Sequence, residues 1–344
     1  MKFSPKYTIT NQLLTNIKRV NSLVIELNSK NLTKVILLEL ERKAREVSSH
    51  ASTSIEGNPL PLTEVKKILK SAPKNARQSE QEVLNYNTAL KALNIILRQK
   101  SPPISKNLIL EIHKKVVSSL LPDYQSGHFR KEPVVVHNPR TGQIVYLPPD
   151  AKDVESMMDS LINFVVEKRN EIDPLIIAGI FHKEFVIIHP FIDGNGRTCR
   201  LATKVLLAMM GLNTFNLFSF ENYYNNNVTN YFENVGVTGN FYDISEKINF
   251  TSWLEYFTGG IIDELLRVQK IISAKLKSEI RLEAHHKKII ELIKKNGLTS
   301  DKEYARITKR ARSTRALDFK KLTEFGVIEK KDKGKATYYK LKST

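Results

Sequence analysis

Twelve residues in the middle of the chain hold the side chains best suited to chemistry. They read HPFIDGNGRTCR from His189 to Arg200. An apolar segment leads into His189, and the proline that follows disfavours helical backbone at the histidine, so we expect the imidazole at a turn. The ordinary pKa of histidine lies near neutral pH, which suits a general base for an incoming hydroxyl group.

A glycine-rich turn follows at Gly194, Asn195 and Gly196. Two glycines permit backbone conformations in which successive N–H groups converge on one point. The next helix, predicted over residues 196–210, begins there with its positive end facing that point. The turn therefore predicts a cradle for an anion.

Two arginines on the first turn of this helix support the same prediction. Arg197 and Arg200 are three residues apart and share a helix face. Cations at a helix N-terminus oppose the macrodipole, so an anion should compensate them. A polyphosphate fits two forked guanidinium groups, and the neighbouring Asp193 can hold the Mg²⁺ that accompanies nucleoside triphosphates.

Each feature also has an ordinary structural interpretation. A histidine before proline is commonly structural, a Gly-Asn-Gly sequence is commonly a turn, and two arginines on a helix commonly form surface ion pairs. Their occurrence together within one short stretch favours the functional interpretation.

Helical periodicity of apolar residues dominates the segments that must position this stretch. It recurs over 13–25, 35–57, 84–97, 108–121, 154–166, 176–188 and 201–210. The exception is a pair of short apolar runs, 134–136 and 144–147, which predicts a β-hairpin that packs on the helices and leaves one edge free.

Composition excludes several classes of protein. The chain has 344 residues, 41% hydrophobic residues and a single cysteine, so it is expected to fold without a disulfide framework or a cysteine metal site. No apolar run is long enough for a membrane helix, and residues 1–29 lack a signal-peptide core. We expect a soluble cytoplasmic protein without membrane contact.

The last fifth of the chain is the basic part. Residues 281–344 contain 19 Lys+Arg and 8 Asp+Glu, within a net charge of +18 for the whole chain. Their pattern predicts three helices and a two-stranded wing, a winged helix-turn-helix. Its second long helix carries Arg312, Arg315, Lys320 and Lys321, which suit the phosphates and base edges of DNA. The alternative is a dimerisation or docking module with an incidental basic surface.

The twelve residues match the pattern H-x-F-x-[DE]-G-N-G-R-x-x-R at every specified position, and over about residues 52–256 the chain resembles the Fic family. Members of that family are mostly adenylyltransferases that move AMP from ATP onto protein hydroxyl groups. Gly196 stands where the family's phosphotransferring toxins carry lysine, which favours AMP transfer. The resemblance implies that His189 is the general base and Asp193 the Mg²⁺ ligand. It implies further that the α-phosphate cradle is formed by Gly194, Asn195 and Gly196, and that the β- and γ-phosphates are contacted by Arg197 and Arg200.

A second motif lies far upstream. Residues Ser52 to Gly57 read STSIEG and fit [ST]-x-x-x-E-[GN], the inhibitory-helix motif of the same family. Taken alone, the segment indicates a helix end at glycine with Glu56 solvated or ion-paired. By the resemblance, Ser52 and Glu56 are inhibitory, and Glu56 occupies Arg200 and prevents productive binding of the γ-phosphate.

The family resemblance also assigns the hairpin and the adenine site. Residues 134–147 fall where the family places its flap, an edge that holds the target segment as an added strand. Either Tyr231 or Phe232 is expected beside the adenine, although their pattern alone indicates helix core.

We therefore expect an all-α Fic-fold bundle with a β-hairpin flap and a C-terminal winged helix-turn-helix domain. The predicted domains are a helical region with the inhibitory motif, the Fic domain, a linking helix and the winged helix, over 1–105, 106–260, 261–284 and 285–344.

The expected reaction is transfer of AMP from Mg-ATP to a Tyr, Thr or Ser hydroxyl of a protein target or of the chain itself. DNA is an expected partner of the winged helix, and a homodimer is left open. Two alternatives remain at this point: removal of AMP from a modified target, and a DNA-binding regulator whose Fic body senses nucleotide.

Overall fold

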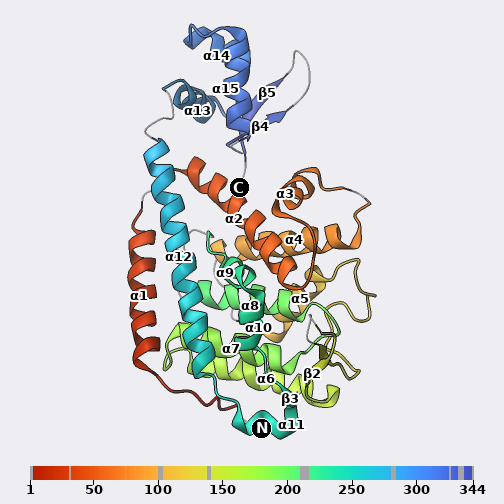
Figure 1. The fold of residues 1–344 in the computed structure, drawn as a ribbon. Helices are drawn as coiled ribbons and strands as arrows, with labels where there is room; N and C mark the ends of the chain where they lie inside the picture. The colour runs from red at the N-terminus through yellow and green to blue at the C-terminus, as the bar shows by residue number, and fades with distance from the viewer. Residues whose placement is uncertain are drawn as a thin grey trace. The chain divides into compact units, whose positions relative to one another are not determined.

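The computed structural model describes residues 3–30, 32–73, 75–99, 104–137, 141–209, 217–279, 284–324, 327–331 and 337–342. The chain is mostly helical, as predicted (Figure 1). Its contacts divide it into two compact units, Met1–Asn28 with Ala44–Leu266 and Ser29–Lys43 with Arg267–Thr344, called here the first and the second unit. The domain bounds drawn from the sequence stay a prediction. Among the described residues, no helix is long and apolar enough to cross a membrane.

Ten α-helices lie wholly within the described part of the first unit. They are α1 (Asn11–Asn28), α3 (Leu62–Ser71), α4 (Gln78–Gln99), α5 (Lys106–Val116), α6 (Ala151–Lys168), α7 (Pro174–Ile188), α8 (Asn195–Met209), α9 (Phe220–Asn226), α10 (Val228–Val235) and α11 (Phe241–Ile244). The 3-10 turn η1 (Ser245–Lys247) follows α11, and the longer helices α2 (Lys34–Ile55) and α12 (Thr251–Glu279) each belong partly to both units.

Helix α7 is the central element of the first unit. All but two of its residues are buried, which fits a helix that is apolar on every side. Its main packing partners are α6 and α8. Gly179 of α7 lets α12 approach closely, because a Cβ at this position would lie 2.6 Å from the Leu254 side chain. Helices α7 and α8 are thus packed together in the buried part of the first unit.

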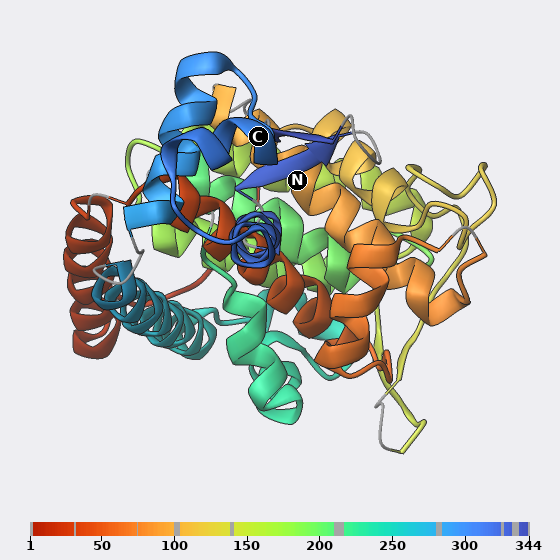
Figure 2. The same cartoon turned by 90° about the horizontal axis from the view of Figure 1, so that it is seen from above.

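The predicted hairpin is present but shorter on its first side. Strand β1 covers only Val136–His137 and pairs antiparallel with β2 (Ile144–Leu147), while β3 (Gly239–Asn240) adds a parallel edge that the sequence did not predict. The hairpin extends away from the helices in the view from above (Figure 2). The middle of its turn, residues 138–140, lies outside the described residues.

The C-terminal part of the second unit has the predicted order of elements. Helices α13 (Ala284–Asn296), α14 (Asp301–Ile307) and α15 (Arg312–Glu324) precede the antiparallel strands β4 (Ile328–Lys331) and β5 (Tyr338–Leu341). Their apolar faces meet in one small core built from Ile289, Ile293, Tyr304, Phe319, Leu322, Val327 and Ile328.

Candidate active site

His189 ends helix α7 at a turn, as predicted. It is the C-cap residue with φ 51° and ψ 59°, and its backbone N–H donates to the Phe185 carbonyl at 3.0 Å. Its Nδ1 atom lies 3.3 Å from the Val186 carbonyl. The proton is therefore assigned to Nδ1, which leaves Nε2 as a proton acceptor.

Burial of His189 favours the neutral imidazole. Burial lowers the pKa of His189, and the nearby Arg130 acts in the same direction. The Val186 carbonyl, Glu56 and Asp193 act to raise the pKa, but the net change is downward. A neutral base at neutral pH is the form that can accept a proton from a hydroxyl group.

The loop after His189 is closed by a side chain expected at the phosphates. Asn195 accepts a bond from the Phe191 N–H at 2.9 Å and donates to the Phe191 carbonyl at 2.8 Å. Phe191 is fully buried. The Asn195 side-chain amide therefore stabilises the loop, and only its backbone is left for an anion.

His113 is a loop-positioning residue that sequence reasoning missed. The Gly127 N–H donates to its Nδ1 at 3.0 Å, so Nε2 carries the proton and donates to the Asp193 carbonyl at 3.0 Å. Its ring stacks on Phe191 with centroids 3.7 Å apart, and burial lowers the pKa of His113 to about 4. A histidine on the apolar face of a helix gave no sequence signal that separates it from ordinary core.

The two arginines of α8 are buried, and part of each guanidinium group is unsatisfied. Arg197 pairs with Asp193 (Nη2 to Oδ2, 2.8 Å), while its Nε and Nη1 have no hydrogen-bond partner among the described atoms. Arg200 donates from Nε to the Ser52 hydroxyl (2.8 Å) and from Nη2 to the Ser52 carbonyl (2.8 Å), and its Nη1 is likewise unsatisfied. Buried donors without partners are costly, and an anion would satisfy them.

Glu56 is the anion that compensates Arg200 in this structure. Its Oε1 accepts a bond from Arg200 Nη2 at 2.7 Å, across 144 residues of sequence. The same oxygen would lie 2.1 Å from a Cβ placed on Gly196. The carboxylate therefore occupies the space over the first turn of α8, where the sequence predicts the phosphates.

The end of helix α2 fixes the position of Glu56. The Gly57 N–H bonds the Ser54 carbonyl at 3.0 Å and the Asn58 N–H bonds the Thr53 carbonyl at 3.1 Å, which is the Schellman pattern. Gly57 has φ +91°, a conformation that a side chain would strain. The helix end expected from the sequence and the inhibitory motif are thus the same structure.

Asp193 is chemically suited to Mg²⁺. Its side chain is 54% exposed beside the turn, and one carboxylate oxygen is tied to Arg197. Magnesium commonly takes one or two carboxylates and completes its octahedron with phosphate oxygens and water. A single exposed carboxylate next to the predicted phosphate cradle fits that requirement.

The expected adenine contacts are only partly available. Tyr231 is 1% exposed, lies 3.0 Å from His182 Nε2 through its hydroxyl group and stacks on Tyr224. The structure places Tyr231 in the core, because its ring completes an aromatic cluster around the buried His182. Phe232 is the partly exposed member of the pair.

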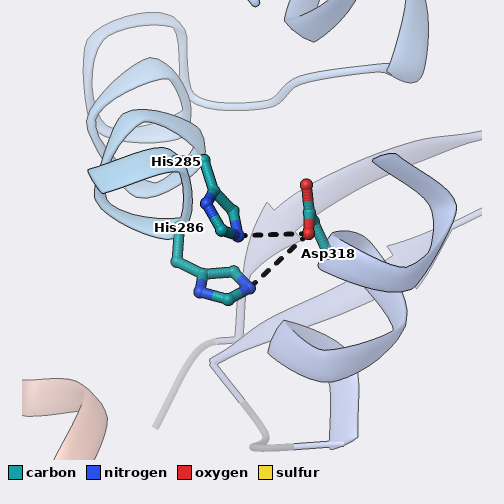
Figure 3. A group of neighbouring side chains, drawn as sticks. All are labelled: His285, His286 and Asp318. Carbon is teal, nitrogen blue, oxygen red and sulfur yellow. Dashed lines mark ion pairs between the residues drawn. The ribbon is translucent and has the colours of Figure 1, made fainter. Parts of the chain in front are cut away.

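A cluster of possible metal ligands lies in the second unit. His285 and His286 of α13 face Asp318 of α15 (Figure 3), with Nε2 to Oδ1 distances of 3.2 and 3.8 Å. Arg310 also binds Asp318 (2.9 Å) and places Nη1 3.2 Å from His285 Nδ1. A histidine that binds metal through Nε2 would turn a Nδ1–H toward this donor, so the cluster serves as an internal ion network.

Comparisons with known proteins indicate the same family as the sequence motif. The Fic/DOC family profile matches residues 103–207. The chain is 34% identical over 164 residues to "Protein adenylyltransferase Fic" of Nematostella vectensis, covering 46% of this chain and 36% of that protein, and 31% identical over 189 residues to the protein of the same name from Aedes aegypti, covering 54% and 36%. The chain thus spans about a third of the length of these curated relatives.

Solved structures show the same fold. A Fic family protein from Desulfovibrio desulfuricans superposes with a TM-score of 0.68 at 21% identity, covering 99% of both chains. Fic-1 from C. elegans superposes with a TM-score of 0.60 at 23% identity, covering 77% of this chain and 73% of that one. The chain therefore contains a Fic domain.

Proposed function

We propose that the chain is a protein adenylyltransferase that moves AMP from Mg-ATP to a Tyr, Thr or Ser hydroxyl of a protein, including its own. The observation that carries this proposal is the group of unsatisfied buried donors on Arg197 and Arg200, beside a glycine cradle and a histidine with a free Nε2. The names of the curated relatives support it.

The reaction follows from the groups around the cradle. Nε2 of His189 accepts the hydroxyl proton, the hydroxyl oxygen bonds to the α-phosphorus, and the bond to pyrophosphate breaks. Backbone N–H groups at 194–196 and the arginine donors stabilise the phosphate charge. Mg²⁺ held by Asp193 would neutralise charge on the leaving pyrophosphate.

Glu56 would act as an intramolecular inhibitor of this reaction. Its carboxylate occupies the Nη2 donor of Arg200 and the space next to Gly196. The same guanidinium donors of Arg200 cannot bind a carboxylate and a γ-phosphate at once. Removal of AMP from a target, with Glu56 positioning water, is the second candidate, because this carboxylate stands beside the cradle with a side chain that is 32% exposed.

Labelled ATP tests the proposed reaction. We expect label from [α-³²P]ATP, and none from [γ-³²P]ATP, to become attached to the protein, most strongly in the Glu56→Gly variant. Label from the γ-position would indicate phosphate transfer. An absence of both labels in wild type and variant, together with release of AMP from a pre-modified protein, would favour the removal reaction instead.

We also propose that helix α15 binds duplex DNA. Arg312, Lys320 and Lys321 are exposed on this helix, within a segment that carries a large surplus of positive charge. Arg315 is not available as the sequence predicted, because its guanidinium pairs with both oxygens of Asp301 at 2.7 and 2.9 Å. That pair is explained by the first turn of α14, which brings Asp301 next to α15.

A mobility shift on random duplex DNA tests this second proposal with the full chain. The affinity should fall steeply with salt, and Arg312→Glu with Lys320→Glu should weaken it by about tenfold or more, because each reversal replaces a phosphate contact with repulsion. Lys294→Glu with Lys295→Glu, an equal charge change on α13, should have a much smaller effect. A full chain without DNA affinity at low salt would favour the docking interpretation.

A further inference from the structure

Arg130 is a buried cation whose hydrogen bonds go to backbone carbonyls. Arg130 is 4% exposed, and no carboxylate of the described residues lies within ion-pair distance of its guanidinium group. The side chain donates from Nε to the His189 carbonyl at 2.8 Å and from Nη2 to the Ile188 carbonyl at 3.4 Å. Its backbone N–H donates to the Pro190 carbonyl at 2.9 Å. One residue thus binds three successive carbonyls around the proposed base.

The same guanidinium group also binds both ends of the hairpin. Nη1 donates to the Glu132 carbonyl at 3.1 Å and Nη2 to the Pro149 carbonyl at 2.5 Å. Glu132 lies just before strand β1, and Pro149 lies just after strand β2. Because guanidinium is planar and rigid, its bonds fix the directions of all these carbonyls relative to one another.

The bonds to Ile188 and His189 also cap helix α7. Carbonyls at a helix C-terminus lack partners and carry the negative end of the dipole, so a cation is favourable there. His189 has φ 51°, a left-handed conformation that is unfavourable for a residue with a Cβ. The hydrogen bond from Arg130 Nε to the His189 carbonyl helps to hold His189 in this strained conformation.

We propose that Arg130 is a positioning residue that fixes the target-holding hairpin in place relative to the base His189. A target hydroxyl presented by the hairpin must reach Nε2 of His189, and a misplacement of about 1 Å can cost a hundredfold in rate. Arg130 does not bind ATP in this scheme. The inference rests on the proposed function for its catalytic consequence, whereas the contacts themselves are independent of it.

The charge of Arg130 gives the inference a second readout. The charged groups that act on His189 are Glu56 and Asp193, which raise the pKa of its imidazole, and Arg130, which lowers it. Loss of the cation should therefore raise the pKa of His189. A lysine retains the charge but not the planar fork, so it should restore the pKa more fully than the rate.

The experiment compares Arg130→Met, Arg130→Lys and Tyr146→Phe, each in the Glu56→Gly background. Tyr146 is the matched control, because its hydroxyl donates to the Ile187 carbonyl at 3.0 Å and ties β2 to the same helix end without a charge. For Arg130→Met we expect kcat for self-modification to fall about 10- to 100-fold while KM for ATP changes less than about threefold. Arg130→Lys should recover part of kcat, and Tyr146→Phe should lose much less.

The imidazole of His189 is titrated by NMR in the same variants, with its signal identified by its loss in His189→Ala. Its pKa should rise in Arg130→Met and stay close to the parent value in Arg130→Lys and Tyr146→Phe. An unchanged pKa with kcat within about threefold of the parent would overturn the proposal, as would an equal loss of kcat in Tyr146→Phe. If Arg130→Met does not fold, the kcat of Arg130→Lys decides. A kcat below that of the parent by more than about threefold would support the proposal, and a kcat within that range would overturn it. Absence of label in every variant would contradict the proposed function, and the titration would still decide the role of Arg130.

Discussion

Replacing His189 with alanine should abolish AMP transfer while ATP binding persists. The base contributes to transfer of the hydroxyl proton, and general-base catalysis is worth about 10²- to 10⁴-fold in rate. In the proposed site the phosphates bind to other groups, namely the backbone of 194–196 and the unsatisfied donors of Arg197 and Arg200. The measurement is incorporation of α-label in the Glu56→Gly background, with nucleotide affinity determined separately.

The control for this variant is His137→Ala, because His137 lies on strand β1 of the hairpin and is a second histidine that could be taken for a base. His137 is exposed, and its Nδ1 lies 2.9 Å from the Gly142 carbonyl. We expect this variant to keep most of its transfer activity. A His189→Ala protein with near-normal labelling would show that His189 is not the base.

The pH profile of transfer gives the same assignment a second check. The base works in its neutral form, and the pKa of His189 is shifted below the ordinary value for histidine. Protonation therefore removes activity only as the pH falls below the ordinary imidazole range, and the acid limb should lie below about 6.5. This limb should be absent from the residual rate of His189→Ala.

Replacing Glu56 with glycine should raise transfer and self-modification. The substitution removes the carboxylate that binds Arg200 Nη2 and that stands against Gly196, so the γ-phosphate gains its partner. Coupling free energies of about 1–3 kcal/mol correspond to a gain between several-fold and a hundredfold. The measurement is the initial rate of α-label incorporation at saturating Mg-ATP.

A graded series of variants isolates the contact between Glu56 and Arg200. Ser52→Ala removes one hydroxyl acceptor of Arg200 but leaves the Ser52 carbonyl, so a smaller gain is expected. Arg200→Ala loses the inhibitory contact and the phosphate contact together and should not be activated, and the double variant with Glu56→Gly should resemble Arg200→Ala alone. Equal rates for wild type and Glu56→Gly would show that Glu56 is no inhibitor, and would return it to the role of a helix-end residue or a water-positioning group.

Local spacing was sufficient for the features that depend on neighbours in the chain. The position of His189 follows from the proline after it, and the first turn of α8 follows from the two glycines. The end of α2 follows from Gly57, because a left-handed C′ residue is a local requirement. Features formed by residues that are neighbours in the sequence can therefore be predicted from the sequence.

Patterns that admit two readings were resolved only by the three-dimensional structure. Tyr231 belongs to the aromatic core because His182 and Tyr224 surround it. Arg315 is paired because Asp301 comes within reach across the turn between α14 and α15. The first strand covers only Val136–His137, and its register with β2 shifts between these two residues.

The sequence by itself was enough to determine the helical class, because apolar periodicity recurs along most of the chain. It also predicted a base, an anion cradle and an inhibitory carboxylate, because their residues lie in short motifs with local spacing. The tertiary structure decided which long-range contacts form. Glu56 meets Arg200 across 144 residues, His113 holds the loop across 80, and Arg130 caps the base across 59. The physical reason is that a buried hydrogen bond between distant residues depends on how helices pack, and helix packing follows side-chain shape over the whole core instead of any one segment.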